Sequence, residues 1–207
     1  MILPVPGRLY GLAKRLVDIA LGSVLLVLAM PLWVLAAAAI KLTSRGPVIF
    51  RQRRIGQNGQ AFTMYKFRSM VVGAEGGRDE LADRNEKDGP VFKIREDPRI
   101  TAVGRILRRT SIDELPQLLN VLRGQMSLVG PRPLWVHEAT KANGRARWRT
   151  VVKPGLTCLW QISGRSELSY EQWVDLDLYY IQHRSLFLDL MILIQTIPAV
   201  LSARGAY

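Results

Sequence analysis

The sequence predicts an α+β fold that is mostly helical, with a re-entrant membrane helix, a small β-hairpin and a core with interfacial amphipathic helices. Three observations favour this fold. Residues 19–40 carry no formal charge, two short strand-like runs flank a turn signal at residues 57–59, and most other apolar positions follow helical spacing. A chain of 207 residues can form one domain with a substantial core, or a domain with a membrane anchor.

The uncharged segment 19–40 would extend about 33 Å as a helix, which is enough to cross a bilayer. One spanning helix is the simplest interpretation. A secretory signal fits less well, because its apolar region is usually only about 7–15 residues long. Pro31 lies in the middle of the segment, where it removes the hydrogen bond to the Val27 carbonyl and favours a bend or a break.

Basic residues flank the segment on both sides, and each flank favours the cytoplasmic side of a membrane. A spanning helix satisfies one flank, whereas a helix that turns at Pro31 and leaves by the same face satisfies both. We therefore expect a membrane segment over residues 1–45 and a cytoplasmic-face domain over residues 46–207. Asp18 is expected to pair with Lys14 on the same helix face. The flanking basic residues are Arg8, Lys14 and Arg15 on one side and Lys41, Arg45, Arg51, Arg53 and Arg54 on the other.

Two short strands follow at residues 47–55 and 61–67, and Gln57-Asn58-Gly59 between them is typical of a hairpin turn. Residues 73–99 are rich in Gly, Asp, Glu and Arg. We expect a long, partly mobile loop there, of the kind that often serves as a functional flap.

Helical spacing returns at residues 102–109 and 115–123. The next segment is extended and ends in Pro131-Arg132-Pro133, whose two prolines would hold the arginine as a rigid fork for a phosphate.

The C-terminal third is expected to be helical. Residues 134–152 form a basic segment with tryptophans near its ends, which is typical of a helix in a membrane interface; a solvated basic face is the alternative. Residues 170–202 are mostly helical in spacing. Their apolar run 186–201 is too short to span a bilayer and is expected to lie in the interface.

The chain is strongly basic, with a formal net charge of +12. This charge indicates a polyanionic partner, and composition alone leaves nucleic acid, anionic lipid and phosphorylated substrates open. Cys158 is the only cysteine, so an intrachain disulfide is excluded. The sequence has neither zinc-type Cys/His spacing nor a glycine-rich phosphate loop.

The densest group of reactive side chains lies at residues 108–116. A structural interpretation is available, because Ser111 and Glu114 have the spacing of a capping box. Pro116 weakens it, since a proline there would delete a hydrogen bond inside the helix. In the catalytic interpretation, Asp113 and Glu114 lie beside two arginines at a helix start that suits phosphate. One carboxylate could then act as a nucleophile, and Mg²⁺ would offset the repulsion from substrate phosphates.

The whole series of motifs resembles that of the monotopic phosphoglycosyl transferases, also called bacterial sugar transferases. The motifs run in order along nearly the whole chain, which makes the resemblance highly specific. They are Lys14-Arg15-Leu-Val-Asp18, the helix with Pro31, Gly46-Pro47-Val-Ile-Phe50, Tyr65-Lys66-Phe67-Arg68-Ser69-Met70, Asp97-Pro98-Arg99-Ile-Thr101, Ser111-Ile-Asp113-Glu114-Leu115-Pro116-Gln117, Ser127-Leu-Val-Gly-Pro131-Arg132-Pro133, Lys153-Pro154-Gly155-Leu156-Thr157, Trp160-Gln161-Ile-Ser-Gly164-Arg165, Leu188-Asp189-Leu190 and Gly205-Ala206-Tyr207.

The resemblance implies transfer of a sugar 1-phosphate from a UDP-sugar to polyprenyl (undecaprenyl) phosphate, as the first membrane step of exopolysaccharide or glycoconjugate synthesis. Asp113 would attack the β-phosphate, release UMP and carry the phosphosugar covalently until the lipid takes it. Glu114 matches the partner acid, and Asp113 would also contact Mg²⁺. A re-entrant helix in one leaflet of the bacterial inner membrane is implied as well. Substrate binding is implied for Lys66, Arg68, Arg108, Pro131, Arg132, Pro133, Gln161 and Arg165.

The sequence departs from the family pattern at two positions. Met30 stands where many members have serine before the helix-breaking proline, so another group must support the bend or the angle must differ. Cys158 stands where glycine is common, which affects a local turn. A hexose donor such as UDP-glucose or UDP-galactose is expected from the resemblance to exopolysaccharide enzymes. A monomer and a homodimer both stay open, as do a complete small enzyme and a catalytic domain of a larger one.

Two other functions compete at this stage. A non-catalytic scaffold on anionic lipid would explain the charge, the tryptophans and the anchor, but it leaves Asp113-Glu114 and Pro131-Arg132-Pro133 unexplained. A nucleic-acid binder would explain only the charge and fits the apolar segments badly. We therefore expect no nucleic-acid partner.

Overall fold

The computed structural model describes residues 7–141, 144–202 and 205. The α+β, mostly helical fold is confirmed. The helices are α1 (Arg8–Thr43), α2 (Ala102–Arg109), α3 (Gln117–Leu122), α4 (Val136–Lys141), α5 (Leu159–Ile162), α6 (Tyr170–His183) and α7 (Leu186–Leu201). The strands are β1 (Ile49–Ile55), β2 (Ala61–Phe67), β3 (Ser127–Val129), β4 (Leu134–Trp135) and β5 (Gly155–Thr157). The 3₁₀ segments are η1 (Gln57–Gly59), η2 (Gly76–Arg84), η3 (Ile112–Glu114), η4 (Gly144–Thr150) and η5 (Arg165–Glu167).

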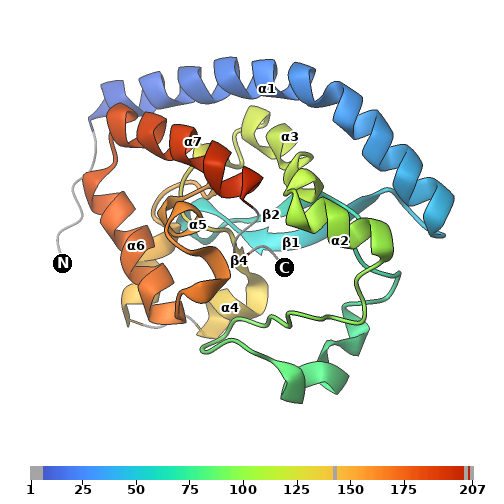
Figure 1. Ribbon diagram of the computed structural model, residues 1–207. Helices are drawn as coiled ribbons and strands as arrows, with labels where there is room; N and C mark the ends of the chain where they lie inside the picture. Colours follow the sequence, from blue (N-terminus) through green and yellow to red (C-terminus); the bar gives the residue numbers. More distant parts are fainter. Residues whose placement is uncertain (1–6, 142–143, 203–204, 206–207) are drawn as a thin grey trace.

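Helix α1 arches over the rest of the protein (Figure 1). The helix break expected at Pro31 is not present, because α1 continues as one helix from Arg8 to Thr43 with the proline inside it. A proline removes one intrahelical hydrogen bond, and the packing of both halves against the domain keeps the remaining turns helical, so the helix curves instead of breaking. The helix is long and apolar enough to cross a membrane by length and composition.

Only one narrow stripe of α1 is buried. Gly22 packs closely on α3, where an added Cβ would lie 3.3 Å from Leu122 Cδ2, so a small residue lets the two helices approach. The outer face stays apolar and exposed, which is the surface expected of a helix that contacts lipid. The buried residues of the stripe are Asp18, Gly22, Ala29, Ala36 and Ile40.

The ion pair expected between Asp18 and Lys14 is not formed. Asp18 is buried and accepts hydrogen bonds from Ser127 Oγ and Leu128 N, both at 2.9 Å. Lys14 instead contacts Asp189 of α7 at 2.8 Å. Both long-range partners remove the carboxylates from water and satisfy them, which a solvent-exposed pair on one helix would not require.

The predicted hairpin is confirmed. Strands β1 and β2 pair antiparallel, with Phe50 opposite Lys66, and β4 joins the free edge of β1 to give the order β2-β1-β4. A second, two-stranded sheet pairs β3 and β5 in parallel. The turn at η1 places Asn58 and Gly59 at positive φ, as the turn residues predicted.

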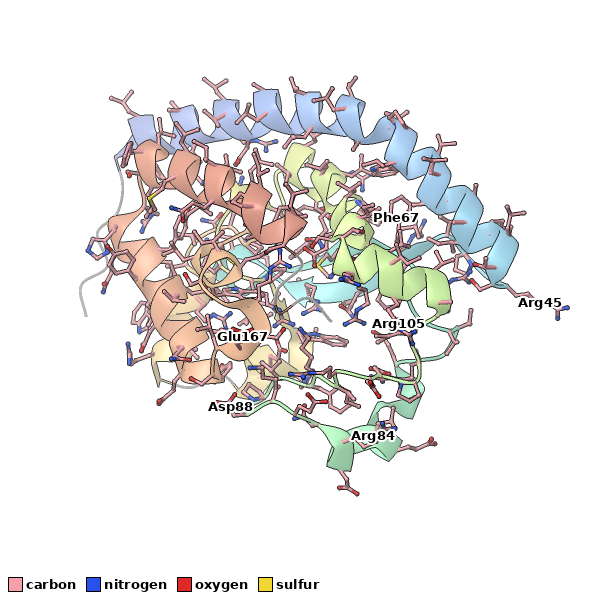
Figure 2. The ribbon with its side chains drawn as sticks, in the orientation of Figure 1. Arg45, Phe67, Arg84, Asp88, Arg105 and Glu167 are labelled. Atoms are coloured by element: carbon pink, nitrogen blue, oxygen red, sulfur yellow. The ribbon has the colours of Figure 1, made fainter. Side chains whose placement is uncertain are left out.

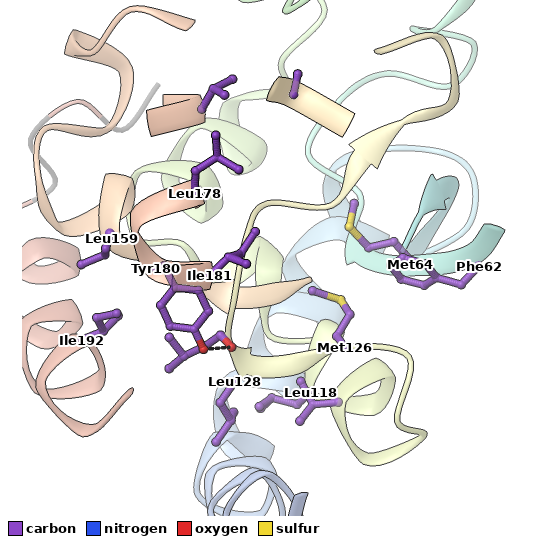
Figure 3. Close-up of a cluster of buried hydrophobic side chains, with 14 residues drawn as sticks. Phe62, Met64, Leu118, Met126, Leu128, Leu159, Leu178, Tyr180, Ile181 and Ile192 are labelled. Atoms are coloured by element: carbon purple, nitrogen blue, oxygen red, sulfur yellow. Dashed lines mark hydrogen bonds between the residues drawn. The ribbon is translucent and has the colours of Figure 1, made fainter. Parts of the chain in front are cut away.

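The main core lies between the hairpin, α3, α6 and α7 (Figure 3). The Tyr180 hydroxyl lies 3.1 Å from the Val129 carbonyl and 2.7 Å from Asp189 Oδ1, so this polar group of α6 is satisfied inside the core. The buried members of the main core include Phe62, Met64, Leu118, Val121, Met126, Leu128, Val129, Leu159, Leu178, Tyr180, Ile181 and Ile192.

The basic helix expected over residues 134–152 is wrong. That stretch contains β4, α4 and η4 instead, and α4 lies on the side of the domain opposite α1 (Figure 1). Arg149 is buried and contacts Asp177 of α6 at 2.7 Å, and Arg145 contacts Asp175 of α6 at 2.5 Å. Arg149 therefore pairs inside the domain, whereas Arg145 pairs at its exposed surface.

Candidate active site

A cavity of about 1060 Å³ opens beside the β1–β2 hairpin. Among the described residues that line it, nine are arginine or lysine and four are aspartate or glutamate. This excess of positive charge suits a polyanionic ligand such as a nucleotide sugar or a lipid phosphate. Of the predicted site residues, all but Pro131 line the cavity: Lys66, Arg68, Arg108, Asp113, Glu114, Arg132, Pro133, Gln161 and Arg165.

The backbone at the two acids has an uncommon shape. Ser111 has φ 57° and makes no side-chain capping bond, so the capping-box interpretation is wrong. Residues Ile112–Glu114 form the 3₁₀ turn η3, and Pro116 then serves as the N-cap of α3. A non-glycine residue in the left-handed region costs about 1–3 kcal/mol. The turn tucks Asp113 into the protein, where only 7% of the residue is exposed.

Lys66 links the two acids across the cavity. Its Nζ lies 2.8 Å from Glu114 Oε1 and 4.0 Å from Asp113 Oδ2. The side chain of Asp113 is 9% exposed, whereas that of Glu114 is 30% exposed. One cation therefore contacts two carboxylates that are adjacent in the chain. The side chain of Asp113 is the more buried of the two, and that of Glu114 is the more exposed.

The two acids differ in pKa. Burial raises the pKa of Asp113 to about 6, with the negative charge of Glu114 adding to the rise and Lys66 opposing it. Burial acts on Glu114 in the same direction, but Lys66 and Arg132 outweigh it and hold the pKa of Glu114 below its usual range. Asp113 is thus mostly ionised near neutral pH yet poorly solvated, which favours nucleophilic attack.

Arg132 is positioned by an acid outside the cavity. Its Nη1 lies 3.2 Å from Glu138 Oε2, which also accepts the Trp135 backbone N–H at 2.9 Å. The guanidinium lies 5.9 Å from the ring centroid of Trp173. A fixed arginine with donors left for a ligand is the arrangement expected of a phosphate-binding fork.

Arg68 and the two prolines have structural contacts. The Arg68 guanidinium donates to the Ser44 carbonyl at 2.9 Å and also to the Arg45 carbonyl, so it caps the end of α1. The Pro133 carbonyl accepts from Arg54 at 3.1 Å, and the Pro131 carbonyl accepts from the Gly155 N–H at 2.9 Å. Arg68 therefore supports the end of α1, and its substrate role stays a prediction.

Gln161 and Arg165 also line the cavity. Arg165 has φ 53°, its backbone carbonyl accepts from Trp173 Nε1 at 3.0 Å, and its Nε donates to the Gln161 carbonyl at 3.3 Å. Ser111 and Arg165, two non-glycine residues at positive φ, thus line the same cavity. Such strain commonly accompanies functional sites.

One cavity residue that the sequence did not reveal is Lys93. It comes from the long loop 73–99, which was expected to be partly mobile. Burial, with the neighbouring charges of Arg108 and Arg132, lowers the pKa of Lys93 to about 7. The loop is fastened by Asn85, which donates to the Val91 carbonyl at 3.2 Å and accepts from Lys93 N at 2.8 Å. A lone lysine in a polar loop gives no signal of this position in the sequence.

Figure 2 shows where the loop of residues 73–99 lies relative to α1. Arg84 and Asp88 mark the loop on the side away from the first half of α1, while Arg45 extends outward at the C-terminal end of α1. The Tyr170 N–H is 3.0 Å from the Asp88 carboxylate, which ties the loop to the start of α6. The loop therefore forms a built wall of the cavity.

The donor set of the site suits a hard cation only in part. Within the described residues, no group of three or more His, Cys, Asp or Glu side chains could hold a metal ion. Mg²⁺ commonly uses one or two carboxylates together with substrate phosphates and water. Asp113 and Glu114 can supply that smaller set.

Comparison with known proteins identifies the family of the chain. The bacterial sugar transferase family matches residues 9–203. The exopolysaccharide production protein ExoY of Rhizobium meliloti is 45% identical over 95% of this chain and 89% of its own length. The UDP-glucose:undecaprenyl-phosphate glucose-1-phosphate transferase of Caulobacter vibrioides is 42% identical over 99% of this chain and 75% of its own.

A further relative is longer. The undecaprenyl-phosphate galactose phosphotransferase of Salmonella typhimurium is 42% identical over 94% of this chain, which spans only 41% of that protein. The similarity of all three relatives therefore covers the membrane helix, the hairpin and the cavity together. The chain belongs to the bacterial sugar transferase family.

Proposed function

We propose that this chain transfers a hexose 1-phosphate from a UDP-sugar to undecaprenyl phosphate and releases UMP. The observation that carries the proposal is the buried, ionisable Asp113 at the wall of a strongly basic cavity. The names of two relatives support the substrate classes, since one is a UDP-glucose:undecaprenyl-phosphate transferase and the other a galactose phosphotransferase. The step would initiate exopolysaccharide synthesis, as the name of a third relative suggests.

In the first half-reaction, an Oδ atom of Asp113 attacks the β-phosphorus of the UDP-sugar. A new O–P bond forms, the P–O bond to the α-phosphate breaks, and its electron pair leaves with UMP. Arg132 and Arg108 line the cavity and can neutralise the charge on the departing phosphate. The product is a phosphosugar joined to Asp113 as an acyl phosphate.

In the second half-reaction, a phosphate oxygen of the lipid attacks the same phosphorus and the Asp113 carboxylate leaves. Glu114, whose pKa is held low by Lys66, is ionised and can accept the proton that the lipid phosphate carries. Lys66 lies within 4.0 Å of both acids, offsets the repulsion between them and adds positive charge where the phosphate would bind.

Mg²⁺ fits this proposal through Asp113, with Glu114 as the second carboxylate. When bound, such an ion offsets the repulsion between the acids and the substrate phosphates. Its removal with a chelator is expected to abolish UMP release.

The way in which α1 is held supports a monotopic arrangement. Near its start, Lys14 pairs with Asp189 at 2.8 Å and Arg15 donates to the Val121 carbonyl at 2.6 Å. Just after its end, Ser44 is held by Arg68. Because both ends pack on the same domain, we propose that they lie at one face of the membrane, the cytoplasmic face of the inner membrane, with the outer surface of α1 in one leaflet.

The direct test is UMP release from UDP-glucose and UDP-galactose in detergent with Mg²⁺. Asp113→Asn should lower the rate on the order of 10³-fold or more, as loss of a nucleophile does. Asp175→Asn, at an exposed acid outside the cavity, is the matched control and should act like wild type. Radiolabel from the sugar should remain on the wild-type protein after denaturation. Equal release by wild type and Asp113→Asn would refute the mechanism.

A further inference from the structure

One wall of the cavity is also part of the outer surface. Val71 and Val72 line the cavity, yet they are 51% and 68% exposed. The described lining of the cavity also contains thirteen charged side chains, nine of them basic. Adjacent apolar residues that stay exposed at the rim of a basic cavity indicate a ligand or surface that covers them.

The segment that carries the two valines is firmly held. Val71 N donates to the Arg99 carbonyl at 2.9 Å, and Arg99 Nη1 donates to the Ala74 carbonyl at 2.9 Å. Met70 forms a β-bridge with Ile100. These bonds fix the backbone on both sides of the valines, so their exposure is a feature of the folded structure.

The same segment abuts the end of the membrane helix. A Cβ added at Gly46 would lie 2.7 Å from Val72 Cγ2, so Val72 packs directly against the residue that follows the end of α1 by three positions. Leu42, in the last turn of α1, is 86% exposed. An exposed apolar residue in the last turn of α1 and an exposed apolar residue at the cavity rim thus lie on either side of the short segment 43–46.

We propose that the polyprenyl chain of the acceptor lipid crosses the rim at Val71 and Val72, with its phosphate inside the basic cavity. This inference rests on the proposed function. An amphiphile needs a site whose polarity changes in the same order as its own, and here an apolar rim beside the end of α1 meets a cavity rich in arginine and lysine. Ile49 and Phe50, half-buried on β1, extend the apolar wall. A sugar nucleotide has no long apolar chain, so its binding would not require an apolar rim.

The test compares the two half-reactions in a Val71→Ser/Val72→Ser double variant. Serine is neutral, so it removes apolar surface without repelling a phosphate. The KM for undecaprenyl phosphate should rise roughly tenfold, which corresponds to about 1.4 kcal/mol. UMP release in the absence of lipid should change by less than about twofold, because chemistry at the donor does not involve the rim.

A Phe187→Ser/Leu190→Ser variant is the matched control. These α7 residues are 79% and 53% exposed and lie outside the cavity, so this pair loses apolar surface without touching the rim. Its KM for undecaprenyl phosphate should stay near that of wild type. An unchanged KM in the rim variant, or equal increases in both variants, would overturn the inference. If wild type released no UMP without lipid, the proposed covalent mechanism would fail instead.

Photocrosslinking gives a second measurement. Val72→Cys can be labelled selectively with benzophenone maleimide, because Cys158, the only native cysteine, is buried and burial raises the pKa of its thiol. On irradiation in micelles, the labelled protein should form an adduct with undecaprenyl phosphate that unlabelled lipid competes away. Phe187→Cys with the same label should give no competed adduct. Equal adducts at both positions would contradict a rim site.

Discussion

Replacing Asp113 with asparagine should make the protein more stable while it abolishes transfer. Burial raises the pKa of Asp113 from 3.8 to about 6, so the folded protein holds this proton more tightly than the unfolded chain does. The wild type therefore loses stability as the pH rises from about 4 to about 7, where the carboxyl ionises in the folded state. A shift of this size corresponds to about 3 kcal/mol near pH 7 and to well under about 1 kcal/mol near pH 4.

Thermal denaturation in detergent, followed by circular dichroism, measures this effect. For a chain of this size about 1 kcal/mol moves Tm by roughly 2–4 °C, so Asp113→Asn should melt roughly 6–12 °C higher near pH 7. The difference should shrink toward pH 4. Asp175→Asn, whose parent side chain is 56% exposed, should melt like wild type at every pH. An Asp113→Asn variant that melts no higher than wild type near pH 7, or a gain independent of pH, would refute this account of the buried carboxylate.

Three further predictions concern positioning, pH and the membrane helix. Glu138→Gln should raise the KM for the UDP-sugar roughly tenfold in steady-state assays with little change in kcat, because Arg132 loses its charged partner at 3.2 Å. In wild type, the KM for the UDP-sugar should rise about threefold or more between pH 6 and 8, because Lys93, with a pKa of about 7, loses its charge over this range. In Lys93→Met the same KM should not change with pH. A pH dependence of KM like that of wild type in this variant would argue against the role of Lys93. Asp189→Asn should lower unfolding stability by about 3 kcal/mol in detergent melts, because Lys14 keeps a largely buried charge without its partner; no loss would contradict that pairing.

Local patterns in the sequence were sufficient for several elements. The hairpin followed from two short strands around Gln57-Asn58-Gly59, and α1 followed from its uncharged stretch, because turn conformation and apolar length are properties of neighbouring residues. The group Asp113-Glu114 was also visible, since acids beside arginines at a chain turn suggest phosphate chemistry.

Other features depended on contacts between distant residues. The partners of Asp18 and Lys14 lie more than a hundred positions away along the chain, and spacing along one helix pointed to the wrong pair. The basic segment 134–152 was predicted to form a helix in a membrane interface, but Arg149 within it is buried against Asp177. A charge pattern shows how many charges a segment carries but not whether another element will neutralise them.

Patterns of neighbouring residues were enough to predict the long apolar helix, the hairpin and the two acids of the site. The folded arrangement was needed to show that Asp113 is buried, that Lys93 reaches the same cavity from a loop, and that Val72 at the rim packs beside the end of α1. The difference lies in the distance along the chain over which each effect acts. Backbone propensity and apolar period act over a few residues, whereas burial and electrostatic environment arise only when segments far apart in the chain exclude water from one another.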